Sequence, residues 1–162
     1  DIGPQFETAF GMRPDVVIRK VEEPQCAAVE LARTLQGTSG GAIEMALDAN
    51  TVIRSEGVVG TIHDSNAGRQ NWLALVSPTG RVFSLMKQLA EPIGGQRRFS
   101  FRLPSAQPGT YVLIATASDD ALVRAGAMVD GTQAADVLPL MVRELSKDGQ
   151  GAVAISVVEI TR

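Results

Sequence analysis

Apolar residues in the middle of the chain recur with a period of two, which is typical of β-strands. The clearest case is residues 71–85, where two apolar runs flank the turn sequence Ser-Pro-Thr-Gly at 77–80. Proline fixes φ at the second turn position and glycine accepts the positive φ that follows, so this segment predicts a hairpin. A strand that is apolar on both faces belongs in the middle of a sheet covered on both sides. In the first run, one face carries Trp72, Ala74 and Val76, and the other carries Leu73 and Leu75.

Other segments of the chain show the same alternation and predict further strands. Residues 98–103 alternate with Phe99 and Phe101 inward and with Arg98 and Arg102 outward. One solvent-exposed face and one apolar face are typical of a strand near the edge of a sheet. A central strand, apolar on both sides, is expected at 111–117, and the others are expected at 43–47, 58–62 and 153–160.

Helical spacing is found towards both ends of the chain. Near the N-terminus a strand is expected at 16–21, followed by a helix with Pro24 in its first turn, where the missing N–H costs nothing. Gly37 is the expected C-cap of this helix. Its apolar stripe consists of Ala28, Leu31, Ala32 and Leu35.

Two helices are expected in the last third of the chain. Ser118 and Asp119 predict the start of a short helix over 119–127, because this pair is what an ordinary helix start looks like. Thr132 is the predicted N-cap of a second helix, which Pro139 should kink or restart. The apolar stripe of the second helix consists of Val137, Leu138, Met141, Val142 and Leu145.

These elements together predict a mainly β fold of the α+β type. Short strands separated by turns, without βαβ alternation, indicate an antiparallel Ig-like β-sandwich with a small N-terminal strand-helix unit and a C-terminal helix plus strand. We expect residues 1–36 to form the strand-helix appendage and residues 42–162 to form the sandwich domain with its helical decoration. The Thr-Ser-Gly-Gly sequence at 38–41 has the composition of a linker between the two.

Composition narrows the classes of function. The chain has 162 residues, which suits one domain, and 15 basic against 18 acidic residues give a net charge of −3. Together with a single Trp and a single Tyr, this charge argues against a nucleic-acid-binding protein. No apolar run approaches the length of about 20 residues that a membrane-spanning helix requires. Because the chain starts at Asp1 without a methionine, we interpret it as a piece of a longer protein or as a processed product.

The single cysteine and the single histidine are the first catalytic candidates. Cys26 lies in the first turn of a predicted helix, where the helix dipole and free N–H groups favour a thiolate, and His63 would be its base. Against this pairing, Cys26 precedes an apolar Ala-Ala-Val run and has no glycine-rich surround for an oxyanion hole. Cysteine is also among the most buried residue types, so we favour a buried structural cysteine.

Three clusters of polar residues can each be interpreted as a functional site or as an ordinary structural feature. His63, Asp64 and Asn66 suggest a metal site, but one histidine is too few for a closed zinc site and no calcium-loop pattern is present, so a polar turn is favoured. The pair Asp119 and Asp120 resembles catalytic carboxylates, yet a helix cap explains it. The arginines Arg97, Arg98 and Arg102 form a basic patch, which we interpret as a solvated edge. The glycine pairs at 40–41 and 94–95 lack the Lys-Ser/Thr of a phosphate loop, so no nucleotide cofactor is expected.

The segment 43–120 resembles a family of uncharacterised bacterial β-sandwich domains. Three pieces carry the resemblance: Ser55-Glu56-Gly57 with its strand, the hairpin 72–85, and the strand Pro108-Gly109-Thr110-Tyr111 to Ser118. Such domains are appended to serine/threonine protein kinases, caspase-like peptidases and related signalling or envelope proteins. The resemblance implies a non-catalytic accessory domain and a membrane-associated bacterial parent, on either side of the membrane. Kinase signatures are absent from this chain.

The sequence therefore favours a non-catalytic recognition or regulatory module that binds a protein or a small ligand through a sandwich face or its loops. No catalytic, cofactor-binding or metal-binding residue is assigned. Two alternatives stay open: a small cysteine hydrolase using Cys26 and His63, and a purely structural assembly domain.

Overall fold

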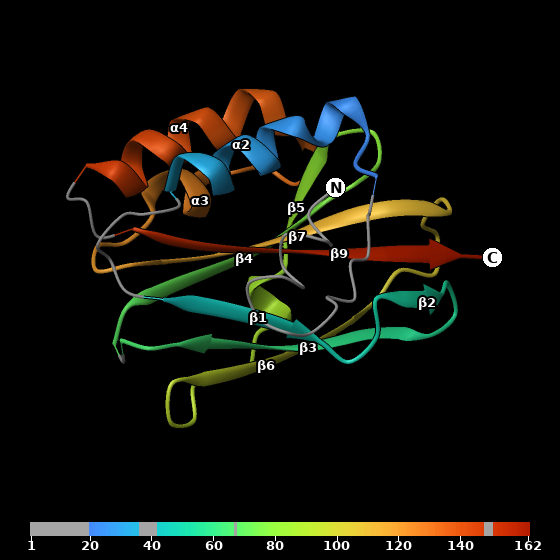
Figure 1. Cartoon of the computed structure of the whole chain (residues 1–162), viewed down its shortest axis with the longest axis horizontal. Helices are drawn as coiled ribbons and strands as arrows, with labels where there is room; N and C mark the ends of the chain where they lie inside the picture. The colour runs from blue at the N-terminus through green and yellow to red at the C-terminus, as the bar shows by residue number, and fades with distance from the viewer. Residues whose placement is uncertain (1–19, 36–41, 67, 148–150) are drawn as a thin grey trace, which may run out of the picture.

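The computed structural model describes residues 20–35, 42–66, 68–147 and 151–162 (Figure 1). The strands in this part of the chain are Ile43–Leu47 (β1), Thr51–Ile53 (β2), Gly57–Asp64 (β3), Gln70–Val76 (β4), Arg81–Ser84 (β5), Gln96–Arg102 (β6), Gly109–Ser118 (β7), Thr132–Gln133 (β8) and Ala152–Thr161 (β9). They form a six-stranded sheet in the order β2-β9-β7-β4-β5-β8 and a three-stranded sheet in the order β1-β3-β6. The helices are Cys26–Leu35 (α2), Val123–Ala127 (α3) and Ala134–Ser146 (α4), with 3-10 turns at Glu23–Gln25 (η1) and Met86–Gln88 (η2).

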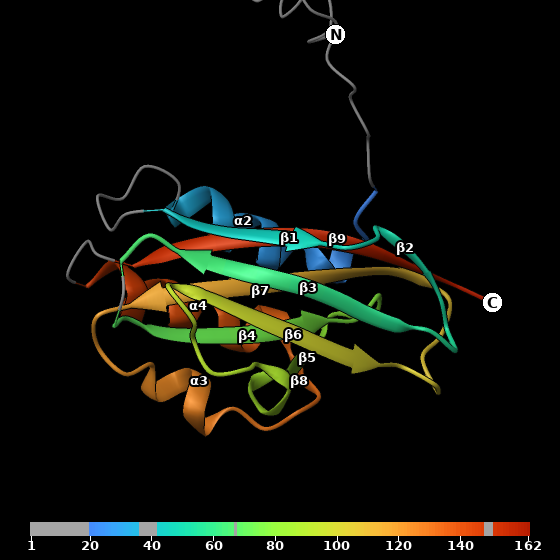
Figure 2. The same ribbon diagram turned by 90° about the horizontal axis from the view of Figure 1, so that it is seen from below.

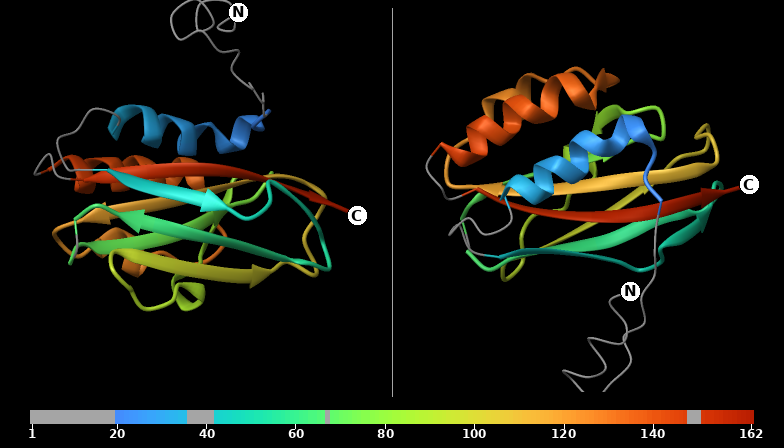
Figure 3. Two further views of the ribbon diagram at one scale, coloured as in Figure 1. Left: turned by 60° about the horizontal axis from the view of Figure 1, so that its bottom comes forward. Right: turned by 45° about the horizontal axis from the view of Figure 1, so that its top comes forward.

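The two sheets pack face to face as an Ig-like β-sandwich, which confirms the predicted fold class. Neighbouring strands are antiparallel, except that the short strand β2 runs parallel to β9. Helices α2 and α4 lie on the other face of the six-stranded sheet, so the structure has three layers (Figures 1 and 2). The six-stranded sheet is thus the middle layer and is covered on both faces, as both views in Figure 3 show.

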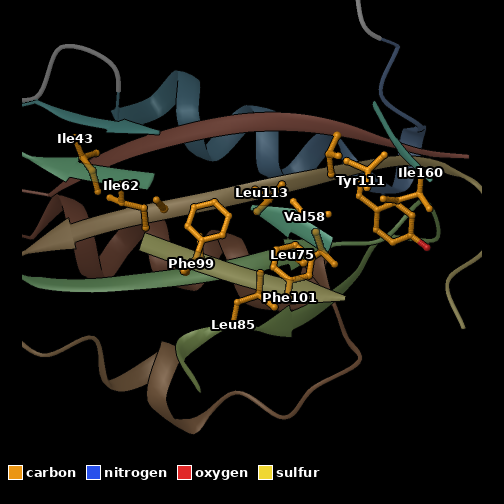
Figure 4. Close-up of a cluster of buried hydrophobic side chains, with 14 of the residues drawn as sticks. Ile43, Val58, Ile62, Leu75, Leu85, Phe99, Phe101, Tyr111, Leu113 and Ile160 are labelled. Carbon is orange, nitrogen blue, oxygen red and sulfur yellow. The ribbon is translucent and has the colours of Figure 1, made fainter. Parts of the chain in front are cut away.

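Strand β4 has the two-sided burial that its sequence predicted. Leu73 and Leu75 belong to the core between the two sheets, where Figure 4 labels Leu75, while alternate residues of the same strand belong to the core beneath the helices. The turn that follows is also as predicted. Gly80 has φ +75° and its N–H donates to the carbonyl of Ser77 at 2.9 Å. The helix-facing residues of β4 are Trp72, Ala74 and Val76.

Strand β6 lies at an edge of the three-stranded sheet, as predicted. Phe99 and Phe101 are buried, with ring centroids 6.3 Å apart, while Arg98 and Arg102 are exposed. Arg97 contradicts the expectation of a fully solvated basic patch. It is half-buried, because the period of two places it on the same inward face as the two phenylalanines.

Helix α2 forms where it was expected, and its apolar stripe packs against α4 and β9. Its start is held by Gln25, a fully buried side chain that the sequence analysis did not single out. The Gln25 Nε2 donates to the carbonyls of Ser77 (3.0 Å) and Thr110 (2.8 Å), and its Oε1 accepts from the Glu22 N–H (2.9 Å). The helix is therefore tied to the hairpin turn and to β7. The expected C-cap Gly37, the linker at 38–41 and most of the strand expected at 16–21 lie outside the described residues, so the domain boundary stays a prediction.

The capping predictions for the last two helices are wrong. Helix α3 begins at Val123, not near Ser118, and its first N–H groups donate to the carboxylate of Glu144 on α4, at 3.0 and 3.1 Å. The N-cap of α4 is Gln133, because the Thr132 hydroxyl donates to the Val129 carbonyl instead. Helix α4 also continues through Pro139 without restarting. Four of its five predicted stripe residues are fully buried: Val137, Leu138, Met141 and Leu145.

Candidate functional site

The structure does not bring Cys26 and His63 together. Cys26 is the first residue of α2, in the helical layer, whereas His63 is exposed on the three-stranded sheet, with the six-stranded sheet between them (Figure 1). The expectation of a buried structural cysteine is also wrong, because the thiol is exposed. The buried stripe of the helix starts at Ala28, and a residue two positions earlier faces the opposite side.

The polar segment after β3 contains a buried ion pair rather than a simple solvated turn. Strand β3 extends to Asp64, and the Asp64 carboxylate accepts bonds from the Arg69 guanidinium, from the Asn71 Nδ2 (3.0 Å) and from the Asn66 N–H (3.0 Å). Asp64 and Arg69 are 6% and 7% exposed. The Asn66 bond is an Asx-type contact, within the segment where the sequence predicted a polar turn. The ion pair therefore joins the end of β3 to the start of β4.

Two opposing effects set the pKa of Asp64. Burial of the carboxylate acts to raise the pKa, but the hydrogen bonds from Arg69, Asn66 and Asn71 and the charge of Arg69 outweigh it, so the pKa lies below the ordinary value of 3.8. Asp64 is therefore ionised at neutral pH. A carboxylate saturated by donors in this way is poorly suited to metal binding, and no metal-binding group of three or more His, Cys, Asp and Glu occurs in the described residues.

The remaining candidates of the sequence analysis lie apart from one another. Asp119 and Asp120 are exposed beside the start of α3, where they line a hollow with Glu144 and Lys147. Gly94 and Gly95 have φ of +58° and +81° and form the tight turn before β6. Among the helices that the structure describes, none is long and apolar enough to cross a membrane.

A mainly apolar hollow lies at the opposite end of the sandwich from Asp64, beside the Ser77–Gly80 turn. We call it the turn pocket; its volume is about 440 Å³. Apolar side chains of the six-stranded sheet and of the connection from β6 to β7 line its walls, and Arg102 at the end of β6 borders it. Its lining residues include Leu75, Phe83, Leu85, Leu103, Tyr111, Arg81, Arg102, Ser77, Thr79 and Ser105.

The turn pocket exists because a three-stranded sheet does not cover a six-stranded one completely. Leu75 and Phe83 are cross-strand partners on β4 and β5, so their side chains lie on the same face of the sheet. Leu75 is 1% exposed, whereas Phe83, one strand further out, is 36% exposed. The apolar surface of β5 is thus left open beside the last covering strand, β6.

Positive charge surrounds this apolar surface. Arg81 and Arg102 line the turn pocket, and no Asp or Glu does. The Arg81 Nη1 donates to the Gly131 carbonyl at 2.9 Å, which holds the guanidinium in place without neutralising its charge. Arg102 makes no ion pair with any described residue. Tyr111 at the base donates its hydroxyl to the Gln107 carbonyl (3.0 Å), and burial raises the pKa of Tyr111, so it remains a neutral donor.

Comparisons with known proteins add little to this geometry. No protein-family model and no curated protein matches the sequence. Among solved structures, the chain is similar to the sulfur carrier protein SoxY from Chlorobium limicola f thiosulfatophilum, with 13% sequence identity and a TM-score of 0.36. The similarity covers 85% of this chain and 99% of that one. A similarity of this size gives no ground for assigning the carrier's role to this chain.

Proposed function

We propose that this chain is a non-catalytic recognition or regulatory module of a larger bacterial signalling or envelope protein, and that it binds its ligand in the turn pocket. The observation that carries the proposal is an open apolar hollow with two arginines and no carboxylate in its lining. Hollows of several hundred Å³ with a few convergent polar groups are typical of ligand sites. The resemblance of residues 43–120 to accessory domains supports the part of the proposal that places this chain in a larger protein.

The residues that line the turn pocket also indicate which class of ligand it would bind. Phe83 and Leu103 provide an apolar wall, while the Arg102 guanidinium stands free to bind a negatively charged group. A ligand that satisfies both features has an apolar chain or ring and one anionic group, such as a carboxylate. A cationic ligand would meet two like charges in the turn pocket and gain nothing from its head group.

Binding of decanoate tests this proposal, with decyltrimethylammonium as a probe of the same tail and opposite charge. We expect saturable calorimetric binding of decanoate, and a rise in the melting temperature that follows its concentration. The cationic probe should give neither. Arg102→Glu should weaken decanoate binding about tenfold or more, which corresponds to about 1.4 kcal/mol.

Arg98→Glu is the matched control, because Arg98 lies on the same strand, carries the same charge change and does not line the turn pocket. At the same ionic strength, the affinity of the Arg98→Glu variant for decanoate should stay within about twofold of that of the unsubstituted chain. Equal weakening by the two substitutions, or equal binding of the two probes, would show that decanoate associates with the surface non-specifically and would contradict the proposal.

A further inference from the structure

A second hollow lies at the end of the sandwich that holds Asp64, and its chemistry is polar. We call it the polar pocket; it has a volume of about 410 Å³. Asp64 at the end of β3, Asn71 near the start of β4 and Arg97 near the start of β6 all face it from the inner surfaces of the two sheets. Arg69 and the Gly94–Gly95 turn also line the polar pocket.

Arg97 is the unusual residue of the polar pocket. Its Nε–H is buried, and no described residue accepts a hydrogen bond from it. The carboxylate that lines the polar pocket does not serve, because the bonds that Asp64 accepts come from Arg69, Asn71 and the Asn66 N–H. A buried charged donor without an acceptor is unfavourable, and arginine cannot relieve the cost by losing its proton.

The charges of the polar pocket do not balance. Asp64 and Arg69 neutralise each other in their buried ion pair, so the guanidinium of Arg97 is one positive charge in excess. A single monovalent anion would restore neutrality. The Nε–H and one Nη–H of a guanidinium form a fork that matches the two oxygens of a carboxylate.

We propose that the polar pocket binds a carboxylate group, which accepts hydrogen bonds from the Nε–H and an Nη–H of Arg97. The excess of one charge favours a carboxylate over a phosphate dianion. The surrounding amides, Asn66 and Gln70, provide neutral donors and acceptors for the polar remainder of a small ligand. This site is independent of the turn pocket, which lies at the other end of β4 and β6.

Nuclear magnetic resonance of the arginine Nε–H groups tests the proposal directly. Sodium acetate is titrated against sodium chloride at constant ionic strength, and inorganic phosphate is titrated in the same way. We expect the Arg97 Nε–H resonance to move downfield and saturate at millimolar acetate. Arg97→Gln should abolish saturable binding, as judged by the Asn71 side-chain amide, while Arg98→Gln on the outer face of the same strand should leave the affinity within about twofold.

Three results would overturn the proposal: a linear shift without saturation up to 100 millimolar acetate, an equal loss of affinity in the Arg98→Gln variant, or tighter binding of phosphate than of acetate. If Arg97→Gln does not fold, Arg97→Lys keeps the charge and removes the fork. It should weaken acetate binding at least fivefold, and an unchanged affinity would contradict the role of the Nε–H.

Discussion

Replacing Asp64 with alanine is expected to lower the free energy of unfolding by about 3–5 kcal/mol, the cost of breaking a buried ion pair. The substitution removes the carboxylate and leaves the Arg69 guanidinium, which is 7% exposed, without its counter-charge. Urea unfolding followed by circular dichroism measures the change as a lower midpoint at an unchanged slope. A loss below about 1 kcal/mol would mean that the pair is solvated, as exposed pairs are.

Asp48→Ala is the matched control, because it breaks the Arg98–Asp48 ion pair, whose side chains are 69% and 59% exposed. The urea midpoint of this variant should barely change.

The pH dependence of stability follows from the lowered pKa of Asp64. The stabilisation that its ionised form provides is fully present above the ordinary value of 3.8, and it is lost as the pH falls through the lower pKa of the folded state. The difference in the free energy of unfolding between the original chain and the Asp64→Asn variant should therefore shrink only in that acidic range.

Replacing Gln25 with methionine is expected to lower the free energy of unfolding by about 3 kcal/mol. Methionine has a similar volume, so the loss comes from the buried carbonyls of Ser77 and Thr110, which lose their donor. Gln88→Met, at an exposed position of η2, is the control and should change little.

The shape of the unfolding curve of Gln25→Met is informative as well. Helix α2 packs on α4 and β9, so we expect one cooperative transition at a lower midpoint. An early, separate transition with loss of helical signal would show that residues 1–36 behave as the independent appendage that the sequence predicted.

The β-sandwich was predictable because its signal is local. The alternation along Trp72 to Val76 and along Tyr111 to Ala117 requires apolar cover on both faces, and helices and a second sheet provide it. The Ser77–Gly80 turn was predictable for the same reason, since proline and glycine act on their own backbone angles.

The capping contacts and the site were not predictable, because their partners are distant in sequence. Glu144 reaches the start of α3 from 20 residues away, so a local Ser-Asp pair was mistaken for the cap. Gln25 bonds to carbonyls 52 and 85 residues away, and nothing in its neighbourhood marks it as buried. The Asp64–Arg69 pair has the sequence of a solvated turn. The inward position of Arg97 was the one signal within reach, since it shares the alternation of Phe99 and Phe101.

The turn pocket and the polar pocket both follow from the architecture. The narrower sheet leaves part of the wider sheet uncovered beside the turn pocket, and polar and charged groups gather at the opposite end, in the polar pocket. Strands contribute Phe83 and Arg102 to the turn pocket and Asp64 and Arg97 to the polar pocket, and turns and connections complete both linings. The proposed recognition function rests on these two hollows.

Methyl-labelled leucine spectra recorded during a titration with decanoate test the central claim most directly, because they report where the ligand lies. The account predicts saturable shifts of the Leu75, Leu85 and Leu103 methyl groups in the turn pocket. It predicts no shift for the methyl groups of Leu31, Leu138 and Leu145, which lie beneath the helices. Shifts confined to the helix-covered leucines, or no saturable shift at all, would contradict it.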